Sequence, residues 1–310
     1  MIPAARLPGY RVLERATHVA PLGLRFWDAV AGAAVGDGLE VVARSLEDPT
    51  RRVEAEANRS GVYVFHRLPG LRVAEAGTGD AAFWASPPAT RRFVVEVADR
   101  AGRFVPLCFE AEAPTRGLFS LACLPLDSPP ASPPAGRPLG VRLYSSAERP
   151  VPPGLAALRA ELWDPLAERP AAWAVLETRV EGLPVARGLA DERGRLVVIV
   201  PYPEPLSTGL GSPPGPDGLH SPPASRRLTE QSWPVTLRAR YAARPGASGV
   251  PDLCDLLAQP PAPLWADTAR TEQLVEARLL FGQELVLRTR DTAGGGPLSA
   301  LWITPAGSPP

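Results

Sequence analysis

The sequence predicts a mainly β protein made of two tandem β-sandwich domains, and three observations lead to this prediction. The chain has 310 residues, which allows two domains of about 100–150 residues each. Proline occurs 39 times, about twice its average usage, and a residue that fixes φ and lacks a backbone N–H disfavours long helices. Short runs in which apolar and polar residues alternate recur between turn residues along the chain, and this pattern is typical of strands.

Strands are expected where Val, Phe, Tyr or Trp alternate with polar residues beside Gly, Pro, Asp or Asn. In the first half these runs are 38–44, 61–66, 92–97, 104–110 and 118–124. In the second half they are 158–163, 173–180, 195–200, 235–241, 284–288 and 301–304. Helical spacing occurs only at 251–257 and 269–279, which predicts one or two short helices. Several strands in each half favour a β-sandwich.

Proline-rich segments set the expected domain boundaries, because such compositions favour extended backbone that buries no core. The expected order is an N-terminal extension at 1–20, a first sandwich at 21–126, a linker at 127–139, a second sandwich at 140–304 with a long proline-rich excursion at 203–227, and a tail at 305–310.

One four-residue pattern occurs in both halves and suggests an internal duplication. Asn58-Arg59-Ser60-Gly61 precedes the run VYVF, and Asp191-Glu192-Arg193-Gly194 precedes RLVVIV. An acidic or amide residue followed three positions later by glycine is typical of a type I turn. Both segments are therefore expected to be turns that begin a buried strand.

Composition excludes several functional classes. All 33 basic residues are arginine, so Schiff-base chemistry and a phosphate-loop lysine are excluded. The 33 acidic residues balance them and lie interspersed, so no nucleic-acid partner is expected. No apolar window is long enough to span a bilayer, and the N-terminal residues do not resemble a secretory signal. We therefore expect no membrane insertion, and a cytoplasmic protein or part of a particle assembled in the cytoplasm.

The three cysteines, Cys108, Cys123 and Cys254, show no C-x-x-C spacing. Cys108 and Cys123 lie in apolar runs, so buried unreactive thiols are expected. A bridge between Cys108 and Cys123 across neighbouring strands is the alternative, and the sequence leaves it open.

Two motifs lie within residues 24–75. One is Trp27-Asp28-Ala29-Val30 before GLEVVA at 38–43, and the other is NRSGVYVF at 58–65 before Leu68-Pro69-Gly70. With them, this part of the chain resembles the carboxypeptidase regulatory-like, or transthyretin-like, β-sandwich family, and the resemblance implies that the two expected sandwiches are Ig-like or transthyretin-like. The family's pattern is a strand and turn followed by D-x-x-G and L-P-x-G.

Five longer segments carry a second resemblance: RFVVEVADRAGRFVP at 92–106, LRAELWDP at 158–165, GLADERGRLVVIVPYPEP at 188–205, QSWPVTLRARY at 231–241 and FGQELVLRT at 281–289. Their arrangement is similar to accessory proteins of contractile injection systems, the phage-tail-like particles of bacteria. It implies a structural or adaptor subunit that docks on a tail, baseplate or cap and has no catalytic residues.

No catalytic or metal constellation emerges from the residues themselves. Glu14 and His18 have helical spacing without a third ligand, and His66 and His220 are isolated. Asp28, Asp99, Asp164 and Asp191 lie near expected strand ends, where turn capping is the alternative to calcium binding. No enzyme activity, cofactor, metal or small-molecule substrate is expected.

Two tryptophans are candidates for binding a partner. Trp84 and Trp265 stand beside prolines in loop-like stretches, where an exposed indole can anchor a protein or stack on a sugar. Packing against the local core is the alternative. We thus expect a non-catalytic structural or adaptor subunit whose partners are other protein subunits, and the alternative function is a carbohydrate-binding or adhesive sandwich.

Overall fold

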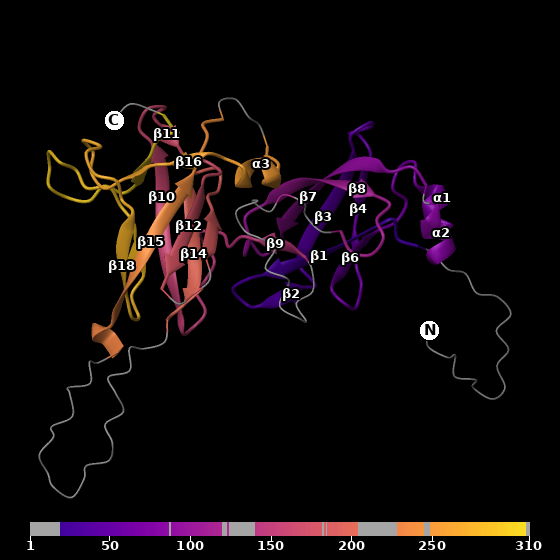
Figure 1. Cartoon of the computed structure of the whole chain (residues 1–310), viewed down its shortest axis with the longest axis horizontal. Helices are drawn as coiled ribbons and strands as arrows, with labels where there is room; N and C mark the ends of the chain where they lie inside the picture. Colours follow the sequence, from indigo (N-terminus) through magenta and orange to yellow (C-terminus); the bar gives the residue numbers. More distant parts are fainter. Residues whose placement is uncertain are drawn as a thin grey trace, which may run out of the picture.

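The computed structural model describes residues 19–86, 88–119, 123, 140–181, 183, 185–203, 228–244 and 249–307. Within these ranges the chain is mainly β, as the sequence predicts, and its sheets are largely antiparallel. Figure 1 shows the strands in two groups, with β1 to β9 on one side and β10 to β20 on the other. The expected linker at 127–139 and most of the excursion at 203–227 lie outside the described residues.

The first group of strands forms two sheets. One sheet has the order β2-β1-β6-β5, with β9 added parallel to β1, and the other has the order β4-β3-β7-β8. The strands are β1 (Leu22–Asp28), β2 (Ala33–Val35), β3 (Leu39–Ser45), β4 (Arg52–Glu54), β5 (Glu56–Ala57), β6 (Val62–Phe65), β7 (Arg91–Asp99), β8 (Leu107–Ala113) and β9 (Val141–Leu143). Two short helices, α1 (Arg72–Glu75) and α2 (Ala81–Ala85), lie between β6 and β7.

The second group also forms two sheets, ordered β11-β10-β20-β17 and β13-β12-β15-β16. Strands β14 and β19 add to β10, and β18 adds to β15. The elements are β10 (Leu155–Asp164), β11 (Arg169–Pro170), β12 (Val175–Val180), β13 (Ala186–Leu189), β14 (Arg195–Pro201), η1 (Leu228–Glu230), β15 (Ser232–Arg240), α3 (Leu253–Leu257), β16 (Pro261–Ala262), β17 (Leu264–Trp265), β18 (Glu276–Leu280), β19 (Leu285–Val286) and β20 (Leu301–Ile303).

Both groups repeat one pairing scheme. Strands β1 and β10 each pair antiparallel with the short strand that follows (β2, β11), antiparallel with a later strand (β6, β14) and parallel with the last strand of the group (β9, β20). Strands β3 and β12 each pair with a short neighbour (β4, β13) and with a nine-residue strand (β7, β15). These nine-residue strands then carry a further edge strand (β8, β18).

The predicted turns occur at the same place in this scheme and have the same hydrogen bonds. Gly61 N donates to Asn58 O at 2.9 Å, and Gly194 N donates to Asp191 O at 3.0 Å. The side-chain oxygen at the first position accepts from two later backbone N–H groups in each turn. Both glycines have positive φ, 69° and 77°, which favours a residue without Cβ. The turn prediction is confirmed in both halves.

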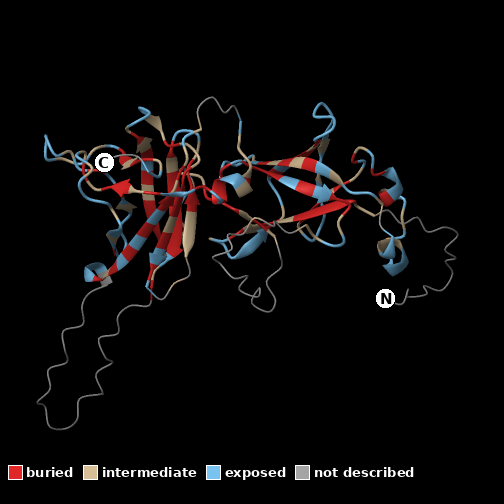
Figure 2. Ribbon diagram, turned by 45° about the horizontal axis from the view of Figure 1, so that its top comes forward, coloured by how far each residue is buried: buried red, intermediate tan, exposed pale blue. Residues whose placement is uncertain are grey.

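Alternation of side chains explains how each pair of sheets encloses a core. Along β7, the side chains of Phe93, Val95 and Val97 are buried, while their neighbours are more exposed. One core cluster gathers apolar side chains from both sheets of the first group, and a second does so for the second group. Figure 2 shows buried residues along the long strands of both groups.

Two structural findings differ from the expectations. The segment 269–279 is not a helix, because its end enters β18; Leu279 in this strand is 0% exposed, while Val275 just before it is 54% exposed. Pairing with β15 outweighs the local helical spacing. The expected strand at 104–110 begins at Leu107, and most of 118–124 lies outside the described residues.

The helix count and the domain boundary also differ. The described residues hold α1 and α2 in addition to the expected α3, and Asp80 caps the start of α2, where its side chain accepts from Phe83 N. Strand β9 pairs with β1, and its residues Val141 and Leu143 belong to the first core. Residues 140–146 therefore complete the first group of strands, although the expected boundary placed them in the second.

Candidate functional site

Helix α3 joins the two groups of strands. It follows β15 in the chain, but its side chains Leu253, Leu256 and Leu257 are 1%, 0% and 6% exposed and belong to the first core. Full burial of a leucine side chain contributes about 1.5–3 kcal/mol. The first core also takes in Val175 and Leu189 from the second group. The two groups therefore share apolar contacts.

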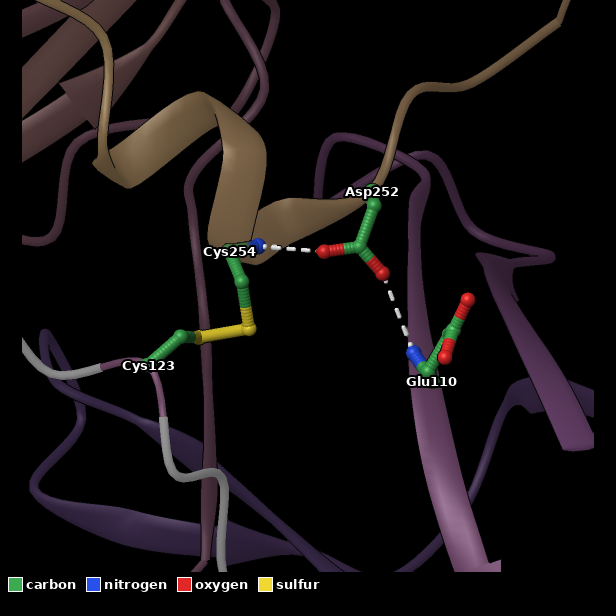
Figure 3. Close-up of a disulfide and its surroundings, with 4 residues drawn as sticks. All are labelled: Glu110, Cys123, Asp252 and Cys254. Carbon is green, nitrogen blue, oxygen red and sulfur yellow. Dashed lines mark hydrogen bonds between the residues drawn. A yellow bond between two sulfur atoms is a disulfide. The ribbon is translucent and has the colours of Figure 1, made fainter. Parts of the chain in front are cut away.

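The carboxylate of Asp252 links the start of α3 to an edge strand of the first group. One oxygen accepts from Cys254 N at 2.8 Å and so caps the helix, and the other accepts from Glu110 N of β8 at 3.0 Å (Figure 3). Residues Cys108 and Asp252 also form a bridge of parallel type. An edge strand leaves backbone N–H groups unpaired, and Asp252 satisfies one of them on β8.

A disulfide between Cys123 and Cys254 links the start of α3 covalently to the segment after β8 (Figure 3). The two cysteines are 131 residues apart in the sequence. The sequence had left open a bridge between Cys108 and Cys123, and that pairing is wrong. Cys108 is the thiol that stays free and buried. Burial, with a further contribution from the Asp252 charge, raises the pKa of Cys108 to about 11, so this thiol is unreactive at neutral pH. The expectation of unreactive thiols holds for Cys108 alone.

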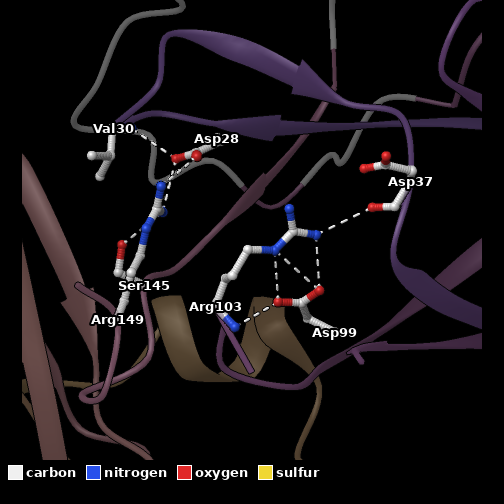
Figure 4. Close-up of polar contacts among 7 residues, drawn as sticks. All are labelled: Asp28, Val30, Asp37, Asp99, Arg103, Ser145 and Arg149. Atoms are coloured by element: carbon white, nitrogen blue, oxygen red, sulfur yellow. Dashed lines mark hydrogen bonds and ion pairs between the residues drawn. The ribbon is translucent and has the colours of Figure 1, made fainter. Parts of the chain in front are cut away.

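A buried ion pair fixes the chain where it leaves the first group. Arg149 donates to both oxygens of Asp28, at 3.0 and 2.6 Å, and also to Ser145 Oγ at 3.1 Å (Figure 4). The two side chains are only 10% and 9% exposed. Burial opposes ionisation of Asp28, but the hydrogen bond and charge of Arg149 outweigh it, and the pKa of Asp28 is lowered. This bidentate pair ties the end of β1 to the segment before β10.

A second arginine forms a similar pair on the neighbouring turn. Arg103 Nη2 donates to Asp99 Oδ1 at 2.9 Å and to the Asp37 carbonyl at 3.2 Å (Figure 4). The guanidinium carbons of Arg103 and Arg149 lie 5.3 and 5.0 Å from the ring centre of Phe104. Such distances allow cation–π attraction.

Further contacts between the groups include a small apolar cluster and one glutamine. Ala157, Val197 and Ile199 of the second group pack with Val30 of the first. Gln259 is 3% exposed, and its amide donates to two carbonyls, of Trp173 and Leu256, at 2.9 Å each. These contacts hold α3 in place. The joint between the groups thus combines a disulfide, a buried ion pair and apolar packing.

The two tryptophans proposed to bind a partner lie in different surroundings. Trp265 is 7% exposed, and its indole N–H donates to Thr304 Oγ1 at 3.1 Å, so local core packing accounts for it. Trp84 lies half-buried on α2, with its ring 5.0 Å from that of Phe83 in an edge-to-face contact. Trp84 therefore keeps an accessible surface, and Trp265 does not.

The aspartates considered for calcium lie at separate turns and ion pairs. Asp164 Oδ1 accepts from Leu166 N at 3.0 Å, and Asp191 caps the second glycine turn. Among the described residues no three His, Cys, Asp or Glu side chains form a group that could hold a metal. His66 Nδ1 lies 2.9 Å from Glu75 Oε1, while Glu14, His18 and His220 are outside the described ranges. No helix in the described part is long and apolar enough to cross a membrane.

Comparison with known proteins gives no family. No family model and no curated protein match the chain. Among solved structures, the C-terminal fragment of the pilus adhesin SpaC from Lactobacillus rhamnosus GG is similar at 7% identity and a TM-score of 0.19, over 93% of this chain and 100% of that chain. A TM-score this low carries no argument about fold or function.

Proposed function

We propose that this protein is a non-catalytic structural or adaptor subunit of a large assembly, built from two tandem Ig-like or transthyretin-like sandwiches. The observation that carries the proposal is the joint. A disulfide and a capping carboxylate at the start of α3, and a buried ion pair at a separate position, join the two groups of strands. A spacer or adaptor must hold two binding surfaces at a set distance, and such a joint supports that role.

The repeated strand-pairing scheme supports the tandem-sandwich part of the proposal. Each group has two sheets around its own core, and the same glycine turn precedes β6 and β14. The motif that resembles the transthyretin-like family falls on β3, β6 and the turn at Leu68-Pro69-Gly70, where Gly70 has a φ of 77°. The assignment to a phage-tail-like contractile injection particle, in its tail, baseplate or cap, rests on the sequence resemblance.

The disulfide bears on where the protein works. Disulfides persist mainly in oxidising compartments and are rare in the cytosol. We therefore propose that a chain made in the cytoplasm forms the Cys123–Cys254 bond when its particle reaches oxidising surroundings. Partners are expected to be other subunits of the particle, with Trp84 on α2 as a candidate contact.

Sedimentation of particles from the source cells tests the proposal. The chain should sediment with sheath and tube proteins through a sucrose gradient, and its deletion should reduce the yield of complete particles. Trp84→Ala should lower incorporation, whereas Leu166→Ala, a truncation of a side chain 48% exposed on the other group, should not. A chain that stays at the top of the gradient and binds polysaccharide gels would instead support the carbohydrate-binding alternative.

A further inference from the structure

A cavity of about 320 Å³ lies where the turn after β1 and strand β9 meet strands β12, β13 and β14. Most of the residues that line it are apolar, among them Val30 from the first group and Val180, Val197 and Ile199 from the second. Ligand sites are usually concave, mainly apolar and about 300–1,000 Å³ in volume. At about 30 Å³ for each water, the space corresponds to roughly ten water molecules.

One cation lines this cavity without an anionic partner among the described residues. Arg142, on β9, has a buried Nε with no hydrogen-bond partner. Its guanidinium lies 6.0 Å from the ring centre of Tyr144, and no carboxylate pairs with it. Burial lowers the pKa of Arg142, and the charge of Arg187 lowers it further. A buried charge is costly unless it is paired and hydrogen-bonded.

The charged groups around Arg142 cannot neutralise it. Arg187 also lines the cavity, and its Nε donates to Glu177 at 2.7 Å. Arg240 lies 3.9 Å from the same carboxylate oxygen. The single charge of Glu177 thus faces the charges of both Arg187 and Arg240. The joint keeps an excess of positive charge beside the cavity.

Thr178 also lines the cavity, but its hydroxyl is closed off from it. Thr178 is 1% exposed, and its Oγ1 has no hydrogen bond among the described residues and almost no accessible surface, so a ligand in the cavity does not reach it. The group that can hold a ligand is therefore Arg142. A guanidinium without a carboxylate partner, in the wall of a cavity, indicates a ligand that accepts hydrogen bonds and carries negative charge.

We propose that this cavity binds a small monocarboxylate with a short apolar body, whose carboxylate interacts with Arg142. The planar guanidinium matches a carboxylate in shape and charge, and the valine and isoleucine side chains that line the cavity contact the apolar body. This binding site does not depend on the adaptor role proposed above.

Hexanoate is the probe, titrated calorimetrically into the full-length chain in a buffer free of other carboxylates, with hexanol as the uncharged analogue. The chain should bind hexanoate saturably and bind hexanol about tenfold more weakly or worse. Arg142→Gln should weaken hexanoate binding about tenfold or more. Arg179→Gln, on the same strand as Thr178 but exposed and outside the cavity, should bind as the unmodified chain does.

Stability without ligand separates binding from a structural role. If Arg142 awaits a ligand, Arg142→Gln should melt at the same temperature as the unmodified chain or higher, because the substitution removes an unpaired buried cation. Hexanoate should then raise the melting temperature of the unmodified chain and of Arg179→Gln but not that of Arg142→Gln. Absence of saturable binding up to about 10 mM hexanoate, equal binding by Arg142→Gln, or a large loss of stability in that variant would each overturn the proposal.

Discussion

Removing the disulfide should destabilise the protein strongly, because the bond closes a very long loop. Cys123 and Cys254 are 131 residues apart. In the chain-entropy model, closing a loop of that length removes about 17 cal/mol/K from the unfolded ensemble, or about 5 kcal/mol at 25 °C. With a urea m-value of about 3 kcal/mol/M, Cys123→Ser should lower the unfolding midpoint by roughly 1.5 to 2 M.

The assay is urea unfolding monitored by tryptophan fluorescence, with and without a reducing agent. Reduction should shift the unmodified chain to the midpoint of Cys123→Ser and leave that variant unchanged. Cys108→Ser is the matched control, because it replaces the free thiol and keeps the bond. It should respond to reduction as the unmodified chain does. A midpoint that reduction does not move, or thiol titration showing three free cysteines in the oxidised protein, would refute the pairing.

Three further predictions concern the joint and the repeated elements. Asp28→Asn should lower the free energy of unfolding by about 3–5 kcal/mol at neutral pH, since it leaves buried Arg149 unpaired. Because the pKa of Asp28 is lowered in the folded chain, the unmodified protein should lose this advantage as the pH falls below 3.8, and the two free energies from urea titrations should approach each other. Tyr241→Phe should cost about 1–3 kcal/mol by removing the hydrogen bond at 3.0 Å to Asp164. Burial, and then the Asp164 charge, raise the pKa of Tyr241 to about 12, so its contribution should be lost as the pH rises above about 10, and thermal melts of Tyr241→Phe should lack that alkaline step. Gly194→Ala should cost at least about 2 kcal/mol in the same melts, because φ is 77° and a Cβ would lie 2.3 Å from a backbone oxygen of β10.

Features set by neighbouring residues could be predicted from the sequence. The alternation along 92–97 and 195–200 predicts β7 and β14, since a strand with one buried face must alternate. The turn at Asn58 and its counterpart at Asp191 could be predicted as well, because the side chain that caps each turn and the glycine that closes it lie within four residues. These are local interactions, and the sequence displays both partners together.

The segment 269–279 shows where local reasoning fails. Val275 and Leu279 have helical spacing, but the backbone of this segment pairs with β15, about forty residues earlier in the chain. Leu279 lies in the second core, whereas Val275, just before β18, is exposed. A helix would have placed these two residues on one face. A local pattern cannot report which distant strand edge is open to receive it.

The contacts of the joint could not be predicted from the sequence, because they too depend on residues that are far apart in the chain. Cys254 reaches Cys123 only because α3 turns back onto β8, and Asp252 finds Glu110 N only because β8 is an edge strand. The partner of Asp28, Arg149, is 121 residues away. Each contact depends on how two sheets pack, so the sequence could name Asp28 as a turn residue without showing the ion pair. The cavity beside Arg142 depends on the same packing. Strand β9 belongs to the first group, but Arg142 lines a cavity whose other wall comes from the second group. Its guanidinium has no carboxylate partner among the described residues, and only the packing of the two groups makes it part of a site for an acidic ligand.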